Sequence, residues 1–357
     1  MTTVSERATT PVPVRVNHRM IAEAAGVSRA TVSLALRGNP AIREATRRRV
    51  RRVADRLGYR PHPAVANYID YVQHRRLQGR YRATLAMLLT EPVCRAADVS
   101  VQRELYDGAV ARATELGYVV EDFLIGGARG LSVRRLREVL VARGIDGVIV
   151  SEGQPAAHGA EVFDWRGLCA VTFGYTLRTP SLSRACSNHF MIVTRLLGRL
   201  EARGYRRVGL VCSEAANERG YRIAKSACLG FQSGLPDERV VPYLQYKDWS
   251  DGEFLAWFER HRPDAIISHD GQRILRSLRA SGVRVPEEVG VASYMRMADQ
   301  RGMCGYSQNF PAVGAAAVDL LAGQLQRNER GAPACPKLVL VDGIWHDGVT
   351  LRDCADE

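Results

Sequence analysis

The 357-residue sequence predicts an N-terminal all-α headpiece with a helix-turn-helix, followed by an α/β core of two subdomains, each a doubly wound parallel sheet. Three observations carry this prediction. Two short apolar stripes at helical spacing flank Gly26, and the excess of positive charge is confined to the same end of the chain. From residue 83 onward, strand-like apolar runs alternate with amphipathic helical runs in two similar series.

The first two helices are predicted on either side of Gly26. Each has one apolar stripe: Ile21, Ala22 and Ala25 in the first helix, and Val32, Ala35 and Leu36 in the second. Gly26 can end the first helix in a left-handed conformation because it has no Cβ atom. Ser28 is a suitable N-cap, since its hydroxyl can accept a hydrogen bond from a free amide of the next helix. A pair of this kind places its second helix in the DNA major groove.

A third helix is predicted over residues 43–57, after a turn at residues 37–40. Its inward positions are apolar, namely Ala45, Val50, Val53 and Leu57. Its outward face carries six arginines: Arg47, Arg48, Arg49, Arg51, Arg52 and Arg56. Such a face is either solvated or in contact with phosphates that flank a DNA site.

The net charge of +12 lies entirely in the first part of the chain. Residues 1–82 hold 17 arginines and five acidic residues, whereas the remaining residues hold as many acidic as basic groups. A polyanionic partner for the first part is the direct inference, because neutralising phosphates releases counterions and favours binding. The alternative is that a basic end only aids solubility.

The composition indicates a cytoplasmic globular protein. Hydrophobic residues make up 46% of the chain, and no apolar run reaches the roughly 20 residues of a membrane span. Residues 1–15 contain charges and prolines without an apolar segment, so we expect a disordered arm and no secretory signal. The eight cysteines show no Cys-x-x-Cys and no paired Cys/His spacing, which predicts reduced thiols, no metal site and no cofactor.

The headpiece resembles that of the lactose/galactose repressor (LacI/GalR) family. The resemblance rests on correctly spaced blocks, which are Ala25-Gly26-Val27-Ser28, Ala30-Thr31-Val32-Ser33, Thr46-Arg47 and Leu57-Gly58-Tyr59-Arg60-Pro61. It implies a headpiece over residues 16–62, a hinge or linker helix over 63–82 and an effector-binding and dimerisation core over 83–354. It also implies a homodimer that binds a near-palindromic double-stranded DNA operator, since a two-fold protein matches a two-fold site.

The predicted hinge departs from the family pattern. Val65, Tyr68, Ile69 and Val72 fall at helical spacing. In the family a leucine of the hinge helix wedges into the minor groove, and the aligned position here is Tyr68, while His62 stands where asparagine is usual. We leave two interpretations open: Tyr68 acts as the wedge, or the segment is a stable dimerising helix.

The core resembles the repressor family's core, which has the periplasmic-binding-protein fold. The matching segments include Gly204-Tyr205-Arg206-Arg207-Val208, Gly230-Phe231 and Gly282-Val283-Arg284-Val285-Pro286-Glu287-Glu288-Val289. The resemblance covers residues 16 to about 352 and implies a first subdomain over about 83–185 and 309–333. The second subdomain is expected over about 186–308 and 334–354, with an effector cleft between the two at the carboxyl ends of the strands.

The cleft residues differ from those of sugar-binding family members. Ala227 replaces a common arginine, and Ser293-Tyr294-Met295-Arg296 replaces a segment with a hydroxyl-binding aspartate. A simple sugar is therefore not expected. The candidate effector-binding residues are Glu91, Asn188, Arg222, His269, Asp270, Tyr294 and Arg296. The two arginines suit an acidic effector, or they pair with Glu91 and Asp270 and leave a cleft that binds nothing.

The candidate DNA contacts lie mainly on the second helix. The full set is Ser28, Arg29, Ala30, Thr31, Ser33, Leu34, Arg37, Thr46, Tyr59, His62 and Tyr68. Arg29 is the candidate for base reading, because a guanidinium can donate two hydrogen bonds to guanine. Ala30 and Leu34 offer apolar contact at most. Ser28, Thr31, Ser33, Thr46 and Tyr59 correspond to phosphate-contacting positions of the family.

No catalytic motif is found. The sequence lacks Gly-x-Ser-x-Gly, a phosphate loop with lysine and a His-x-x-x-His pair, so we expect no enzyme. The predicted function is a sequence-specific transcription regulator, with repression the expected mode, modulated by a small molecule if the cleft binds one. The alternative is a solute-binding protein of the same core fold with a non-specific basic nucleic-acid anchor.

Overall fold

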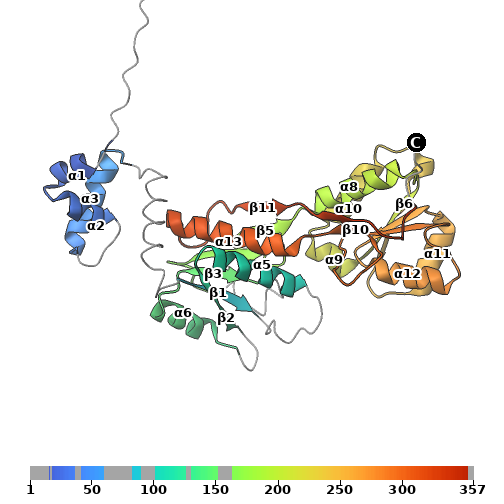
Figure 1. The fold of residues 1–357 in the computed structure, drawn as a ribbon, viewed down its shortest axis with the longest axis horizontal. Coiled ribbons are helices and arrows are strands. Elements are labelled where there is room, and N and C mark those ends of the chain that lie inside the picture. Colours follow the sequence, from blue (N-terminus) through green and yellow to red (C-terminus); the bar gives the residue numbers. More distant parts are fainter. Residues whose placement is uncertain are drawn as a thin grey trace, which may run out of the picture. The chain divides into compact units, whose positions relative to one another are not determined.

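The computed structural model describes residues 16, 18–36, 42–59, 83–89, 101–125, 130–151 and 163–352. The chain divides into two compact units, residues 1–81 and residues 82–357 (Figure 1). Each unit has its own buried core, and the two are described separately below.

The first unit contains three helices around one small core. They are α1 (His18–Ala25), α2 (Arg29–Leu36) and α3 (Glu44–Arg56). Ile21, Val32 and Val50, one from each helix, are fully buried together. Gly26 has φ +61°, which confirms the predicted left-handed end of α1. The predicted cap is also confirmed, because Ser28 Oγ accepts a hydrogen bond from the Thr31 amide at 3.0 Å.

The second unit begins with a six-stranded sheet in the order β11-β5-β4-β3-β1-β2, and all of its pairings are parallel. Its strands are β1 (Thr84–Leu89), β2 (Val119–Leu124), β3 (Gly147–Val150), β4 (Cys169–Phe173), β5 (Ser183–Ser187) and β11 (Leu338–Val341). Helices α5 (Val101–Glu115) and α13 (Phe310–Arg327) cover one face of this sheet, and α6 (Val133–Ala142) covers the other (Figure 1). Strands β1, β3 and β4 are apolar on both faces because helices bury both.

A second six-stranded sheet follows the same plan, in the order β12-β10-β9-β8-β6-β7, with only β12 antiparallel. Its strands are β6 (Val208–Ser213), β7 (Leu244–Tyr246), β8 (Ala265–Ser268), β9 (Gly290–Ser293), β10 (Cys304–Ser307) and β12 (Ile344–His346). The longer helices around it are α8 (His189–Ala202), α10 (Ile223–Gln232), α11 (Asp251–His261) and α12 (Gly271–Ala280). Two short helical segments, α9 (Glu214–Arg219) and η2 (Asp237–Arg239), complete this subdomain.

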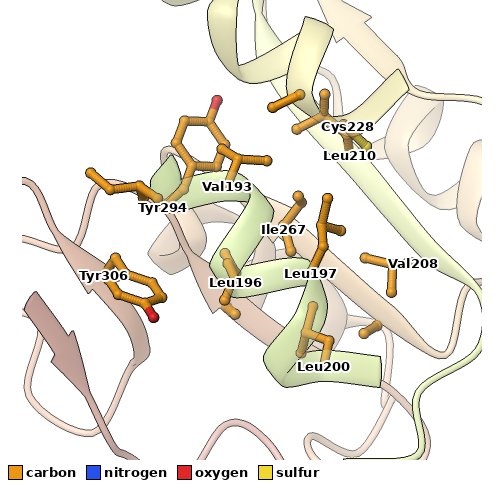
Figure 2. Packing of buried hydrophobic residues seen from close by; sticks show 14 of the residues in the cluster. Val193, Leu196, Leu197, Leu200, Val208, Leu210, Cys228, Ile267, Tyr294 and Tyr306 are labelled. Atoms are coloured by element: carbon orange, nitrogen blue, oxygen red, sulfur yellow. The ribbon is translucent and has the colours of Figure 1, made fainter. Parts of the chain in front are cut away.

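The core of the second subdomain lies on both faces of its sheet. On one face, Leu196, Leu197 and Leu200 of α8 pack toward Ile267 of β8 and Cys228 of α10 (Figure 2). On the other face, α11 and α12 bury side chains that include Phe254, Trp257 and Leu278. The predicted pair of doubly wound subdomains is therefore confirmed.

Three crossings of the chain join the two sheets. They lie between β5 and α8, between β10 and α13, and between β11 and β12. The family resemblance predicts that residues from about 334 to 354 belong wholly to the second subdomain. The structure differs, because residues 338–341 form β11 and pair with β5 in the first sheet, so the last crossing lies at Asp342 and Gly343.

Candidate nucleic-acid interface and effector site

The exposed start of α2 is the candidate base-reading element. Ser28 caps the helix, and its hydroxyl also lies 2.9 Å from the Thr31 hydroxyl. Arg29 and Ala30, the first two residues of α2, are exposed. An open concavity lies beside them at the turn between α1 and α2, and its lining includes Arg19, Glu23 and Gly26. The cap therefore fixes the position from which the Arg29 side chain projects.

The candidate phosphate contacts lie at or on α2, on α3 and just after α3. Thr31 and Ser33 of α2 and Thr46 of α3 are half-buried, as is Leu34. Tyr59 follows α3, and its hydroxyl lies 2.7 Å from His18 Nε2 while the two rings are 5.3 Å apart. Burial raises the pKa of the Tyr59 phenol, which stays protonated and able to donate. Three further candidates, Arg37, His62 and Tyr68, lie outside the residues that the structure describes.

A second set of candidate residues gathers at the carboxyl ends of four neighbouring strands in the second sheet. This strand-end site consists of Ser213 and Tyr246, the last residues of β6 and β7, and of His269 and Tyr294, which directly follow β8 and β9. His269 Nε2 lies 3.3 Å from Ser213 Oγ. Its other nitrogen, Nδ1, is buried and has no hydrogen-bond partner among the residues that the structure describes. Burial lowers the pKa of His269, so the imidazole is neutral at pH 7 and Nδ1 can accept a hydrogen bond from a ligand.

Aromatic rings surround His269. The Tyr246 ring stacks on the imidazole at 6.4 Å, and the Tyr294 ring lies 6.3 Å away on another side. Trp249 meets Tyr246 edge to face at 5.0 Å. The sequence pattern indicated His269 and Tyr294 but not Tyr246, which ends the three-residue strand β7, or Trp249, which follows it.

The charged candidates have partners other than those considered from the sequence. Arg222 forms a salt bridge with Glu218, at 2.6 Å. Arg296 Nε donates to the Met303 carbonyl at 3.0 Å. The proposed pairing of these arginines with Asp270 is therefore wrong for the described contacts, since Asp270 binds Arg273 at 2.9 Å.

Asp270 and Asn188 have structural roles. Asp270 Oδ1 accepts from the Arg273 amide at 3.1 Å and caps α12. Asn188 caps α8 through the Met191 amide, and its Nδ2 donates to Asp342 at 3.0 Å, next to two of the chain crossings. Glu91 lies outside the described residues.

A contact that the sequence did not reveal joins the two subdomains beside the strand-end site. Tyr221, between α9 and α10, meets Tyr175 of the first subdomain edge to face at 5.6 Å. The Arg178 guanidinium lies 4.8 Å from the Tyr221 ring, and its Nη2 donates to the Glu218 carbonyl at 3.3 Å. Tyr221 and Arg222 both have positive φ, at 53° and 59°, a conformation that no local sequence signal announced.

The described cysteines are free thiols. Cys212 and Cys228 are buried in the second subdomain, and burial raises their pKa values to about 11 and about 12, so they are unreactive. Among the residues that the structure describes, no three His, Cys, Asp or Glu side chains gather as a metal site would require. Within the same residues, no helix combines the length and the apolar character needed to cross a bilayer.

Two family models match the chain. Residues 19–62 match the family described as bacterial regulatory proteins, lacI family, and residues 197–344 match the periplasmic binding protein-like domain. The first match covers the three helices of the first unit. The second covers most of the second subdomain and includes the strand-end site.

Individual relatives agree with these matches. The HTH-type transcriptional regulator CelR of Thermobifida fusca is 28% identical over 289 residues, which are 77% of this chain and 80% of CelR. Two solved structures share the fold. The CelR–cellobiose complex is 22% identical with a TM-score of 0.53, covering 94% of this chain and 100% of that one. The lac repressor dimer bound to operator and the anti-inducer ONPF is 18% identical with a TM-score of 0.54, covering 94% and 99%.

These matches extend from the helix-turn-helix to the last crossing of the core. The chain therefore has the DNA-binding helix-turn-helix of the lacI family before a periplasmic-binding-protein-like core, which is the domain arrangement of a LacI/GalR-type transcription regulator.

Proposed function

We propose that this regulator is a homodimeric repressor that reads a near-palindromic operator. The observation that carries the proposal is the exposed, capped start of α2 within the segment that matches the lacI family. Arg29 is the first residue of that helix and projects beside the turn, where major-groove reading takes place. A two-fold dimer presents two such helices to a two-fold site.

The roles of the headpiece residues follow from their chemistry. Arg29 donates two hydrogen bonds to one guanine, and Ala30 offers a methyl group to a thymine or contacts nothing. The hydroxyls of Ser28, Thr31 and Thr46 bind phosphates, which fix the register of α2 without reading sequence. Ser33, Leu34, Tyr59, Arg37 and His62 complete the proposed contact set, and Tyr68 is the proposed minor-groove wedge.

The operator is to be selected from randomised duplex DNA with the purified full-length protein. We expect an enriched site with two-fold symmetry. On that site, Arg29→Ala should cost about 1–3 kcal/mol at one base pair of each half-site, because one bidentate contact is lost. Arg276→Ala, on α12 of the core, is the matched control and should leave affinity unchanged. Equal loss on every sequence would make Arg29 a phosphate contact, and selection without enrichment would contradict operator reading.

We further infer that the strand-end site binds a neutral, ring-containing ligand rich in hydroxyl groups. Tyr246 and Tyr294 offer flat aromatic faces, and the buried Nδ1 of His269 lacks the donor that a ligand hydroxyl would supply. Arg222 and Arg296, which favoured an acidic effector from the sequence, are engaged by Glu218 and by the Met303 carbonyl. The relative CelR, whose solved complex holds cellobiose, supports the same ligand class.

Titration calorimetry with cellobiose and with cellobionate, its acidic counterpart, tests this ligand class. We expect cellobiose to bind at least tenfold more tightly, because the aromatic faces and the neutral His269 favour uncharged hydroxyl groups over a carboxylate. His269→Ala should weaken cellobiose binding at least tenfold, whereas His261→Ala, at the end of α11, should not change it. Preference for the acid, or binding of neither sugar, would contradict the proposed class.

A further inference from the structure

The positive charge of the headpiece is concentrated on the helix that does not read bases. Arg29 is the one charged residue of α2, the base-reading helix. Helix α3, by contrast, carries six arginines among its 13 residues: Arg47, Arg48, Arg49, Arg51, Arg52 and Arg56. Its acidic residues are Glu44 and Asp55. The electrostatic attraction of the described helices for DNA must therefore come largely from α3.

Most of these arginines are solvent-exposed and unpaired. Val50, Val53 and Ala54 bury the inner side of α3 against α1 and α2. Arg48 pairs with Glu44. Of the other exposed arginines, Arg49, Arg51, Arg52 and Arg56 have no ion pair with any residue that the structure describes. We call these four side chains, together with Arg48, the α3 arginine surface.

The spacing of these arginines works against the helix itself. Arg52 lies four residues from both Arg48 and Arg56 and three residues from Arg49. Like charges at these spacings are neighbours on a helix and destabilise it. An anion bound across the surface would remove this repulsion. A guanidinium binds phosphate in a bidentate fashion, which makes phosphate the best-matched anion.

The partner follows from the shape of the headpiece. Val32 of α2 and Val50 of α3 point into one core, so the exposed faces of the two helices look in different directions. While α2 lies in the groove, α3 is left with backbone rather than base edges. At about 1.5 Å per residue, α3 is roughly 20 Å long, the axial length of about six base pairs.

We infer that the α3 arginine surface binds the sugar-phosphate backbone that flanks the half-site read by α2, and so provides most of the salt-dependent affinity. The inference rests on the proposed function, because it assigns α2 to the groove. Two helices of one headpiece, α2 and α3, would then contact the same duplex. This contact also explains why a self-repelling helix is present in this headpiece.

The test measures DNA affinity and helix stability in the same full-length variants. Arg52→Glu replaces repulsion with attraction toward Arg48 and Arg56, so amide hydrogen exchange of the α3 peptides should slow several-fold. The same substitution should weaken binding to a 40-base-pair duplex of arbitrary sequence at least tenfold in low salt. A residue that only supports the fold would change stability and DNA affinity in the same direction. Higher stability together with lower affinity therefore indicates that Arg52 contacts DNA. Arg276→Glu on α12 changes the net charge equally and should leave both quantities unchanged.

Salt titrations provide the second measurement. Arg51→Ala with Arg52→Ala removes four cations from the dimer, and the slope of log affinity against log salt should fall by about 3 to 4. An unchanged slope, or a parallel loss of stability and affinity in Arg52→Glu, would overturn the inference. A complex of the protein with one duplex can be held on a bead and offered a second, labelled duplex. If the second duplex were captured, the α3 arginine surface would bind a separate DNA molecule, which would also overturn the inference. None of these measurements requires a known operator, so failed operator selection would be distinguishable from failure of this surface.

Discussion

In the first subdomain, helices α5 and α13 cross with their backbones in contact, whereas the glycines of α8 and α10 in the second subdomain, Gly198 and Gly230, have open space beside them. A Cβ atom on Gly108 of α5 would lie 2.0 Å from the Pro311 carbonyl oxygen of α13. One on Gly314 of α13 would lie 2.1 Å from the Leu105 carbonyl oxygen. Gly198 of α8 has no atom within 4 Å of such a position. The glycines of α5 and α13 thus permit a close crossing of two helices, whereas Gly198 of α8 faces open space.

The strand ends of the two sheets also differ, in whether their polar groups are already hydrogen-bonded within the protein. In the first sheet, the hydroxyls of Thr172 and Ser187 are used internally, donating to the carbonyls of Val150 and Gln308 at 2.9 and 2.7 Å. In the second sheet, aromatic rings surround His269, whose Nδ1 has no hydrogen-bond partner within the described part of the chain. The first subdomain therefore contributes rigid packing and the crossings, while the second contributes most of the described groups that can recognise a ligand.

Substitution of one glycine in each subdomain would test the packing difference. Gly108→Ala should destabilise the protein by about 3 kcal/mol or more, because the new methyl group collides with backbone that cannot rotate away. Gly198→Ala should stabilise it by about 0.5–1 kcal/mol, since alanine loses less conformational freedom in a helix and the site is open. Urea unfolding of the two full-length variants measures both effects. Equal effects would show that the α5–α13 crossing adapts as easily as the surface of α8.

The sequence predicts the fold well because alternation of strands and helices is a local pattern. It fails at β11, since Leu338-Val339-Leu340-Val341 has the pattern of a strand in either sheet. Only pairing with β5, about 150 residues earlier in the chain, decides the sheet to which it belongs. Local periodicity contains no information about that choice.

Prediction of the sites succeeds and fails for similar reasons. Ser28 is found because capping depends on neighbouring residues alone. The position of His269 at a strand end could be predicted because His269 directly follows a clear strand, and its role in a ligand site stays a prediction. Arg222 forms an ion pair with Glu218, four residues earlier, which the spacing of the two residues in the sequence could have indicated. Tyr175 and Tyr221 could not be paired from sequence, because their contact depends on how two subdomains meet.

At the crossing between β5 and α8, where the two subdomains join, we expect a smaller effect on stability that depends on pH. His189 begins α8, and its Nδ1 accepts from Gln308 Nε2 at 3.1 Å, while the Tyr175 ring lies 5.8 Å away. Burial lowers the pKa of His189 to about 4. An unfolded histidine has a pKa of about 6.5, so between these values the unfolded state binds more protons than the native state. Stability should therefore fall as the pH is lowered through this window.

The size of this effect follows from the shift. At pH 5, His189 should account for roughly 2 kcal/mol of lost stability relative to pH 7. His189→Gln keeps a polar side chain beside Gln308 but cannot titrate, so its free energy of unfolding should change less over this range. Urea unfolding of both proteins from pH 7 to pH 5 measures the difference. If both proteins lose stability equally, titration of His189 is not what makes the protein sensitive to acid. His269 of the strand-end site then becomes the group to test, because burial also lowers its pKa.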